Sequence, residues 1–140
     1  MPLFLWHPQL ATGVPHLDDL RRGLLAAMNQ LHGYAEQECH PSRIAVAFAE
    51  LTVAVARYCA AEELYLEATH DLDRHRHAYV HARLQRQLSG HYAAYLAGDG
   101  SLDPQVFGFL LHWVRTHLAT VDTWRAEPTV AARPTSDLQR

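Results

Sequence analysis

Two histidines one helical turn apart are the residues whose spacing most directly suggests chemistry. His77 and His81 lie four positions apart, so on a helix both imidazoles point to the same side and can bind one metal ion. The chain contains eleven histidines, and a pair at this spacing arises by chance about once in such a composition. The pair therefore indicates a metal site only with support from other elements.

Glu62 and His117 supply that support, because each falls on the apolar face of another predicted helix. A carboxylate or imidazole buried among aliphatic side chains without a partner is costly, and a shared cation removes the cost. We therefore favour a metal bound by His77, His81 and His117. The alternative is a hydrogen-bonded polar core that holds no metal.

Four helical segments would position these side chains. Apolar residues recur at helical spacing in each of them, and Pro15, Pro41-Ser42 and Gly98-Asp99-Gly100 separate them. The predicted ranges are about 16–38, about 41–66, 70 or 73 to about 96, and from Asp103-Pro104 until shortly before Pro128. Short connections between helices of this length favour an all-α, antiparallel up-down-up-down four-helix bundle.

The two ends of the chain differ from the helical part. We expect residues 1–126 to form one domain, in which residues 1–15 are an extended N-terminal arm and Trp6 packs over the bundle. Residues 127–140 contain Pro128, Pro134 and few large apolar side chains, which predicts a disordered C-terminal tail.

Composition limits the classes of function. The formal charge is −3 over 140 residues and every basic residue is an arginine, so nothing favours nucleic acid as a partner. The apolar stretch at residues 2–6 is too short to cross a bilayer and has no basic residues before it, so neither a signal peptide nor a membrane helix is expected. Cys39 and Cys59 are expected to be free thiols. We expect a cytoplasmic protein.

The spacing of the candidate ligands resembles the hemerythrin family, non-haem di-iron four-helix bundles that bind oxygen reversibly. His77 lies fifteen positions after Glu62, and Asp122 lies five positions after His117. The resemblance covers residues 6–122 and includes a tryptophan in the N-terminal arm. In the family three histidines hold one iron and two carboxylates bridge the pair. Their matches here are His77, His81, His117, Glu62 and Asp122.

The second iron of the family takes two further histidines, and here the sequence departs from the pattern. The family's Asp-x-x-His on the first helix appears as Asp18-Asp19-Leu20-Arg21. Its His-Phe-x-x-Glu-Glu on the second helix appears as Tyr58-Cys59-Ala60-Ala61-Glu62-Glu63. One half of the site is complete, and the other has lost both terminal ligands. We therefore predict fewer than two tightly bound metal ions.

Arg21 cannot ligate a metal, because a guanidinium stays protonated and offers only donors. It would repel a divalent ion about 5 Å away by about 6 to 7 kcal/mol at an effective dielectric near 20. If Arg21 points inward, Glu62 and Asp122 are its expected partners, and it takes the electrostatic place of the missing ion. The alternative is that its aliphatic stem carries the charge to the surface.

Tyr58 and Cys59 each have two interpretations. Tyr58 is a phenolate ligand for ferric iron or a core tyrosine whose hydroxyl bonds to Glu62 or Asp122. Cys59 is a small buried apolar residue or, less in keeping with its surroundings, a thiolate ligand. Together with Arg21 they are the candidate catalytic residues. His16, His70, His75 and His112 are expected to be solvated or to cap helices.

The function implied by the resemblance is a small non-haem iron protein with an asymmetric or mononuclear site. One or two iron ions are the expected cofactor, with zinc or manganese as other candidates. Expected ligands are a small diatomic molecule such as O2 or NO, a peroxide, or a small-molecule substrate, and the protein would be a sensor or, if an enzyme, an oxidoreductase of the oxidase, peroxidase or oxygenase type. The alternative is a helical binding module, either with a structural zinc or without metal, that performs no redox chemistry.

Overall fold

Four α-helices dominate the structure, a computed structural model that describes residues 2–122, with side chains as far as residue 119. They are α1 (Pro15–Glu36), α2 (Pro41–Ala68), α3 (Arg74–Ala97) and α4 (Gln105–Trp113). A 3-10 helix at Pro8–Leu10 precedes them and a π-helix at Val114–Asp122 follows. The described residues contain no strand, which confirms the all-α prediction.

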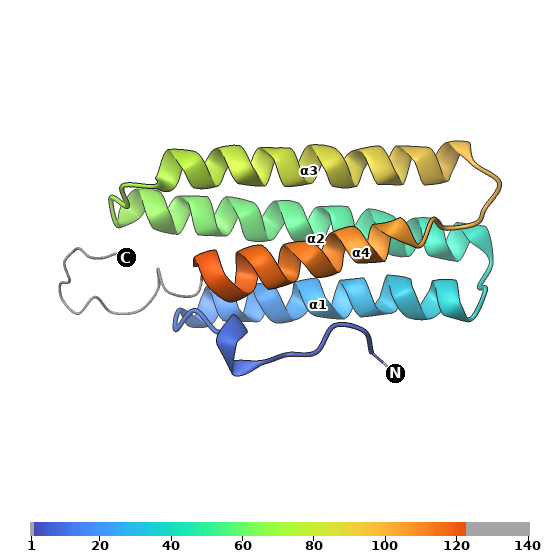
Figure 1. The fold of residues 1–140 in the computed structure, drawn as a ribbon, viewed down its shortest axis with the longest axis horizontal. Helices are drawn as coiled ribbons and strands as arrows, with labels where there is room; N and C mark the ends of the chain where they lie inside the picture. The colour runs from blue at the N-terminus through green and yellow to red at the C-terminus, as the bar shows by residue number, and fades with distance from the viewer. Residues whose placement is uncertain (1, 123–140) are drawn as a thin grey trace.

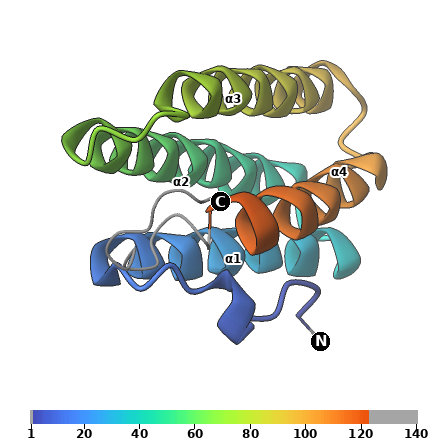
Figure 2. The same cartoon turned by 60° about the vertical axis from the view of Figure 1, so that its left-hand side comes forward.

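The helices lie side by side along the length of the molecule (Figure 1). α2 packs against both α1 and α3. The loops from α1 to α2 and from α3 to α4 lie at one end, and the loop from α2 to α3 lies at the other (Figure 1). Figures 1 and 2 both show the N-terminal arm running along α1 on the side away from α3.

Proline begins α1 and α2, where a missing N–H costs nothing and φ is preset for a helix. His40 caps α2, because its Nδ1 accepts the Ser42 backbone N–H at 3.1 Å. At the same end of the molecule the Tyr95 hydroxyl donates to the Pro41 carbonyl at 3.1 Å. Gly100 has φ +95°, and a Cβ there would lie 2.9 Å from the Pro41 side chain. Glycine is therefore required where these two loops touch.

The inward face of α2 forms the centre of the core. Its predicted members recur every three or four residues, and all are buried: Ile44, Phe48, Leu51, Val55, Tyr58, Glu62 and Leu66. By length and composition α2 could also cross a membrane, with a mean hydropathy of 1.6 over its most apolar window. The expectation of no membrane helix concerned residues 2–6, which are not part of α2. Helices in a protein core pass the same test, and the inward face of α2 is buried.

The N-terminal arm is fastened to α1 by apolar and polar contacts. Phe4 and Leu10 are its buried anchors, with 3% and 4% exposure. The Phe4 backbone exchanges two hydrogen bonds with the Asn29 amide, each 2.8 Å long. Trp6 is half-buried against the core, and the Arg22 guanidinium lies 4.2 Å above its ring. Residues 123–140, which include the predicted tail, lie outside the described residues.

The last helical segment differs from the single helix predicted. It is α-helical as far as Trp113 and π-helical from Val114. A π-helix adds a residue to each hydrogen-bonded turn and is frequent at functional sites. Apolar spacing did not reveal the change, because the residues that face the core recur at a similar interval in both geometries.

Candidate metal centre

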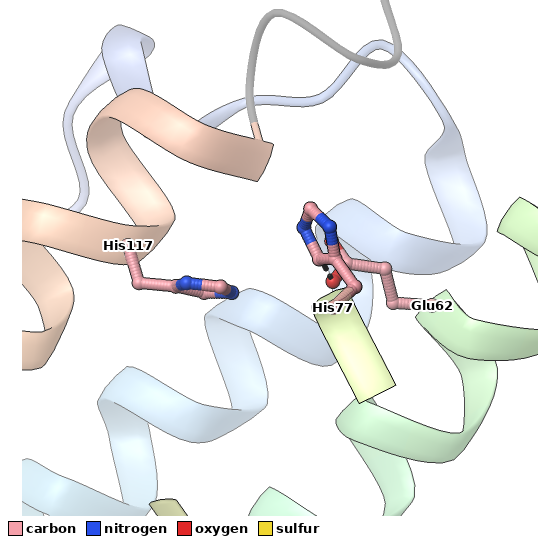
Figure 3. Close-up of side chains that lie close together, drawn as sticks. All are labelled: Glu62, His77 and His117. Carbon is pink, nitrogen blue, oxygen red and sulfur yellow. Dashed lines mark ion pairs between the residues drawn. The ribbon is translucent and has the colours of Figure 1, made fainter. Parts of the chain in front are cut away.

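Glu62, His77 and His117 converge from three elements at the end of the molecule where α2 turns into α3. Glu62 comes from α2, His77 from α3 and His117 from the π-helix (Figure 3). One ligand atom from each lies within 4.8 Å of the other two. The side chains are only 3%, 2% and 6% exposed, so the cluster is closed to bulk water.

His81 adjoins this cluster and contacts a carboxylate through each ring nitrogen. Its Nε2 lies 3.0 Å from Glu62 Oε1, and its Nδ1 lies 2.9 Å from Glu63 Oε2. Its ring centroid is 5.6 Å from that of His77 and 5.3 Å from that of His117. The three histidines predicted to bind metal therefore surround one region, and Glu62 Oε1 faces it.

The pKa of His81 is raised to about 11. Burial alone would lower it, but the hydrogen bonds with Cys59 and Glu62 and the negative charge of Glu62 outweigh that effect. A protonated His81 places positive charge beside Glu62 without a metal. A metal ligated by His81 must therefore displace this proton.

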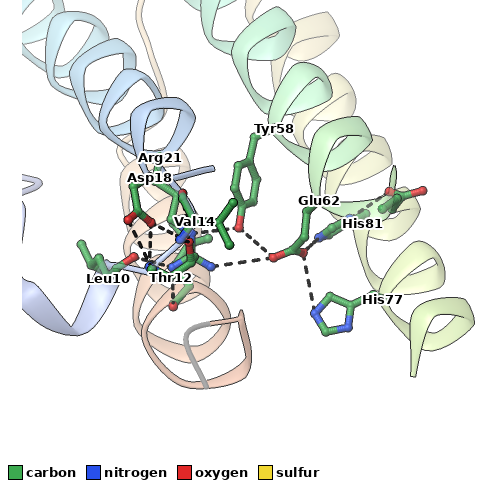
Figure 4. Close-up of polar contacts among 12 residues, drawn as sticks. Leu10, Thr12, Val14, Asp18, Arg21, Tyr58, Glu62, His77 and His81 are labelled. Atoms are coloured by element: carbon green, nitrogen blue, oxygen red, sulfur yellow. Dashed lines mark hydrogen bonds and ion pairs between the residues drawn. The ribbon is translucent and has the colours of Figure 1, made fainter. Parts of the chain in front are cut away.

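The second oxygen of Glu62 faces a different set of groups. The Tyr58 hydroxyl donates to Glu62 Oε2 at 2.9 Å, and Arg21 Nη2 lies 3.8 Å from the same oxygen (Figure 4). One carboxylate thus separates an imidazole side from a guanidinium side. The predicted pairing of Arg21 with Glu62 is confirmed, whereas the side chain of Asp122, its other predicted partner, lies outside the described residues.

Arg21 is fully buried, with 0% exposure, so the interpretation that it reaches the surface is wrong. Its Nε donates to the Tyr58 hydroxyl at 2.8 Å. Its Nη1 donates to the Leu10 carbonyl at 2.5 Å and to the Leu118 carbonyl at 3.1 Å. These bonds occupy the planar fork of the guanidinium and hold it against Glu62.

Tyr58 and Cys59 both take the structural roles considered for them. The Tyr58 hydroxyl accepts from Arg21 and donates to Glu62, as expected of a core tyrosine with a satisfied hydroxyl. Cys59 is 1% exposed, and burial raises the pKa of its thiol. A thiol in such surroundings stays protonated and unreactive.

The donors on the imidazole side fit one first-row divalent ion. Imidazole nitrogens with one carboxylate oxygen suit zinc, iron or manganese, so the donor set does not select among them. A second ion does not fit on the other side of Glu62. The oxygen that would bind it already faces a phenol and a cationic guanidinium, neither of which is a neutral nitrogen ligand.

Two neighbours of the cluster had no role assigned from sequence. Glu63 lies off the inward face of α2, so periodicity gave no reason to connect it with His81. Trp113 precedes His117 by four residues and its ring stacks on that imidazole, with centroids 5.4 Å apart and planes 14° apart. The four-residue spacing of Trp113 and His117 was the feature of the sequence that could have predicted this stacking. His16, His70, His75 and His112 are exposed, as expected.

Comparison with models of known protein families and with curated proteins found no match to this chain.

Proposed function

We propose that the chain is a hemerythrin-like protein that binds one non-haem metal ion, with iron as the expected metal. One observation carries the proposal: Glu62, His77 and His117 are all buried and bring their ligand atoms within 4.8 Å of one another. A cation shared by these groups would lower the cost of burying them. His81, beside the same Glu62 oxygen, would complete a set of three imidazoles and one carboxylate.

The site would be mononuclear because Arg21 holds the charge that a second ion would supply. Its guanidinium is buried, is fixed by backbone carbonyls, and faces Glu62 Oε2. A divalent ion brought to that oxygen would meet a fixed positive charge at short range, a repulsion of several kcal/mol even at an effective dielectric of about 20. We infer that Arg21 and Tyr58 replace one half of a di-iron site.

Bound iron would supply one-electron chemistry toward a small ligand such as O2, NO or a peroxide, in a sensor or an oxidoreductase. The chain's own groups would set the conditions. Glu63 would hold a proton on His81 Nδ1 and so direct Nε2 to the site. Trp113 would cover the His117 ring and exclude water. Tyr58 would keep its proton on the bond to Glu62 Oε2.

The fold that we propose with this function is the antiparallel up-down-up-down bundle of the family. The alternation of loops between the two ends of the molecule supports it (Figure 1). In that arrangement α2 and α3 bring the segments around Glu62 and His77 together near the loop that joins them.

Metal content and absorption spectrum test the proposal directly. Protein purified without chelator should contain close to one iron per chain, with absorption in the near-ultraviolet or visible region. The double variant Arg21→His with Tyr58→His should bind additional iron and gain the absorption of an oxo-bridged pair, because it restores neutral imidazoles beside Glu62 Oε2. Two ions in the parent protein would contradict the mononuclear site. Colourless protein that binds no iron after reconstitution would contradict the function.

A structural zinc is the second candidate, and the low exposure of the ligands favours it. Structural zinc sites are closed, whereas catalytic sites keep an open position for water or substrate. Exposure of only 2% to 6% at the three clustered residues fits the closed type. Tight binding of zinc, with a colourless iron-free protein and a large loss of thermal stability on chelation, would establish this role instead.

A further inference from the structure

The N-terminal arm and the last helical segment line a pocket beside Leu10, whose carbonyl accepts from Arg21. The pocket has a volume of about 290 Å³. The arm contributes residues from Leu3 to Leu10, and the other wall comes from α4 and the π-helix. The lining residues are Leu3, Phe4, Leu5, His7, Gln9, Leu10, Leu111, Val114, Arg115 and Ala119.

The pocket is apolar inside and carries positive charge without any negative charge. Seven of its ten lining residues are aliphatic or aromatic, Arg115 is cationic, and none is acidic. An anion placed here would find a cation and no repelling carboxylate among the lining residues.

His7 adds a second donor at the pocket. Its Nδ1 accepts the Gln9 backbone N–H at 3.1 Å, as the cap of the 3-10 helix. In a neutral imidazole the proton must then lie on Nε2, which becomes a donor. Arg115 and His7 both line the pocket, one from the π-helix and one from the arm, so both are candidates to contact an acidic head group.

Two of the aliphatic side chains that line the pocket remain exposed to solvent. Leu5 is 68% exposed and Leu3 is 37% exposed, although both belong to the arm that Phe4 and Leu10 anchor. Large aliphatic side chains left in water beside a concave apolar surface gain free energy when a hydrocarbon covers them. The volume lies near the lower limit of about 300 Å³ for small-molecule pockets, which selects a short chain rather than a long lipid.

We propose that this pocket binds a short aliphatic monocarboxylate, with the hydrocarbon along Leu3, Leu5 and Leu111 and the carboxylate at Arg115 and His7. The site is separate from the metal centre and does not depend on a bound metal. It nevertheless touches the same support: the Leu10 carbonyl accepts from Arg21, and Leu10 also lines the pocket. Binding in the pocket should therefore also perturb the hydrogen bond that the Arg21 guanidinium donates to Leu10.

Titration of the full-length protein with hexanoate, octanoate and 1-octanol tests the proposal. Each added CH2 group should tighten binding about fourfold, from about 0.8 kcal/mol per buried group, so octanoate should bind about fifteenfold more tightly than hexanoate. Amide NMR shifts should appear at residues 3–10 and 111–119, together with a shift of the Arg21 Nε–H signal. Absence of saturable binding, or shifts confined to other parts of the chain, would overturn the site.

The variant Arg115→Gln tests the head group, with Arg86→Gln on the exposed surface of α3 as its control. Loss of one solvent-facing ion pair should weaken octanoate by about two- to fivefold and leave 1-octanol unchanged, while the control should alter neither. An equal effect of Arg115→Gln on both ligands, or none on octanoate, would show that the carboxylate is not recognised there. Preserved helical circular dichroism would establish that the variant is folded.

Discussion

The two oxygens of the buried Glu62 carboxylate face different sources of positive charge. Oε1 faces His81 and His77, whose charge depends on a proton or on a metal ion. Oε2 faces Arg21, whose charge is permanent, and Tyr58. The first counter-charge is exchangeable and the second is fixed by the sequence. A protein that carries both can gain or lose a metal on one side without leaving the buried carboxylate uncompensated.

The largest expected effect comes from removing the fixed charge. Arg21→Ala removes the permanent counter-charge from Glu62 Oε2 and leaves two backbone carbonyls without their donor. Breaking a buried pair from one side costs about 3 to 5 kcal/mol, so urea denaturation of the metal-free protein should show a loss of that size. Arg86→Ala is the matched control, since the Arg86 side chain is exposed on α3. Equal stability of Arg21→Ala and the parent would refute the role of Arg21 as a substitute for an ion.

Removing an imidazole should abolish metal binding beside Glu62 Oε1 and leave the contacts of Arg21 with Glu62 Oε2 unchanged. His77→Ala should lose the metal and with it the stabilisation that binding provides, about 2.7 kcal/mol when free metal exceeds the dissociation constant a hundredfold. His81→Ala should behave in the same way. Thermal denaturation with and without added metal measures the difference, and His75→Ala, an exposed position on the same helix, is the control. A metal content unchanged in both ligand variants would remove these histidines from the site.

Tyr58→Phe should weaken the fixed side without removing its charge. The substitution deprives Arg21 Nε of an acceptor and Glu62 Oε2 of a donor, both in a buried setting. A lost partner of this kind costs about 1 to 3 kcal/mol, and the metal should remain bound. If the absorption spectrum of the iron-loaded protein changes on this substitution, Tyr58 is a ligand and the two sides are not separate.

The smallest expected effect comes from Glu63, which orients the His81 ring beside Glu62 Oε1. Glu63→Gln keeps an acceptor for His81 Nδ1–H but removes its charge, which should weaken metal binding by about tenfold, the low end for a group that orients a ligand. Competition with a chelator of known affinity measures the change. Glu67→Gln, an exposed position one turn later on α2, should leave the affinity unchanged. A similar loss in both variants would indicate a general effect of charge.

Sequence periodicity was sufficient to predict the helices and the buried face of α2. Each apolar residue on that face repeats at helical spacing, and burial follows from the repeat. It was sufficient, too, to select the three histidines and Glu62 that the fold brings together. The orientation of Arg21 was not predictable in this way, because a long side chain on an apolar face can turn inward or outward.

The contacts that decide that orientation depend on tertiary structure. The carbonyls of Leu10 and Leu118 hold Arg21 inward, and backbone carbonyls leave no trace in residue type. The π-helical geometry around His117 was missed for a different reason, because core-facing residues recur at a similar interval in both kinds of helix. Two expectations stay predictions from the sequence. One is that Asp122 completes the site, and the other is that residues 127–140 are disordered.

The hydrogen bonds of Arg21 also have a consequence for the order in which the protein folds. One guanidinium group joins Leu10 to Leu118 through its Nη1, and the second of these bonds spans 97 positions of the chain. Contacts between segments so far apart in sequence form slowly, after local helices are in place. The two walls of the arm pocket should therefore dock last during folding. In native-state hydrogen exchange the amides around residues 10 and 118 should open together, at a lower free energy than those in the middle of α2.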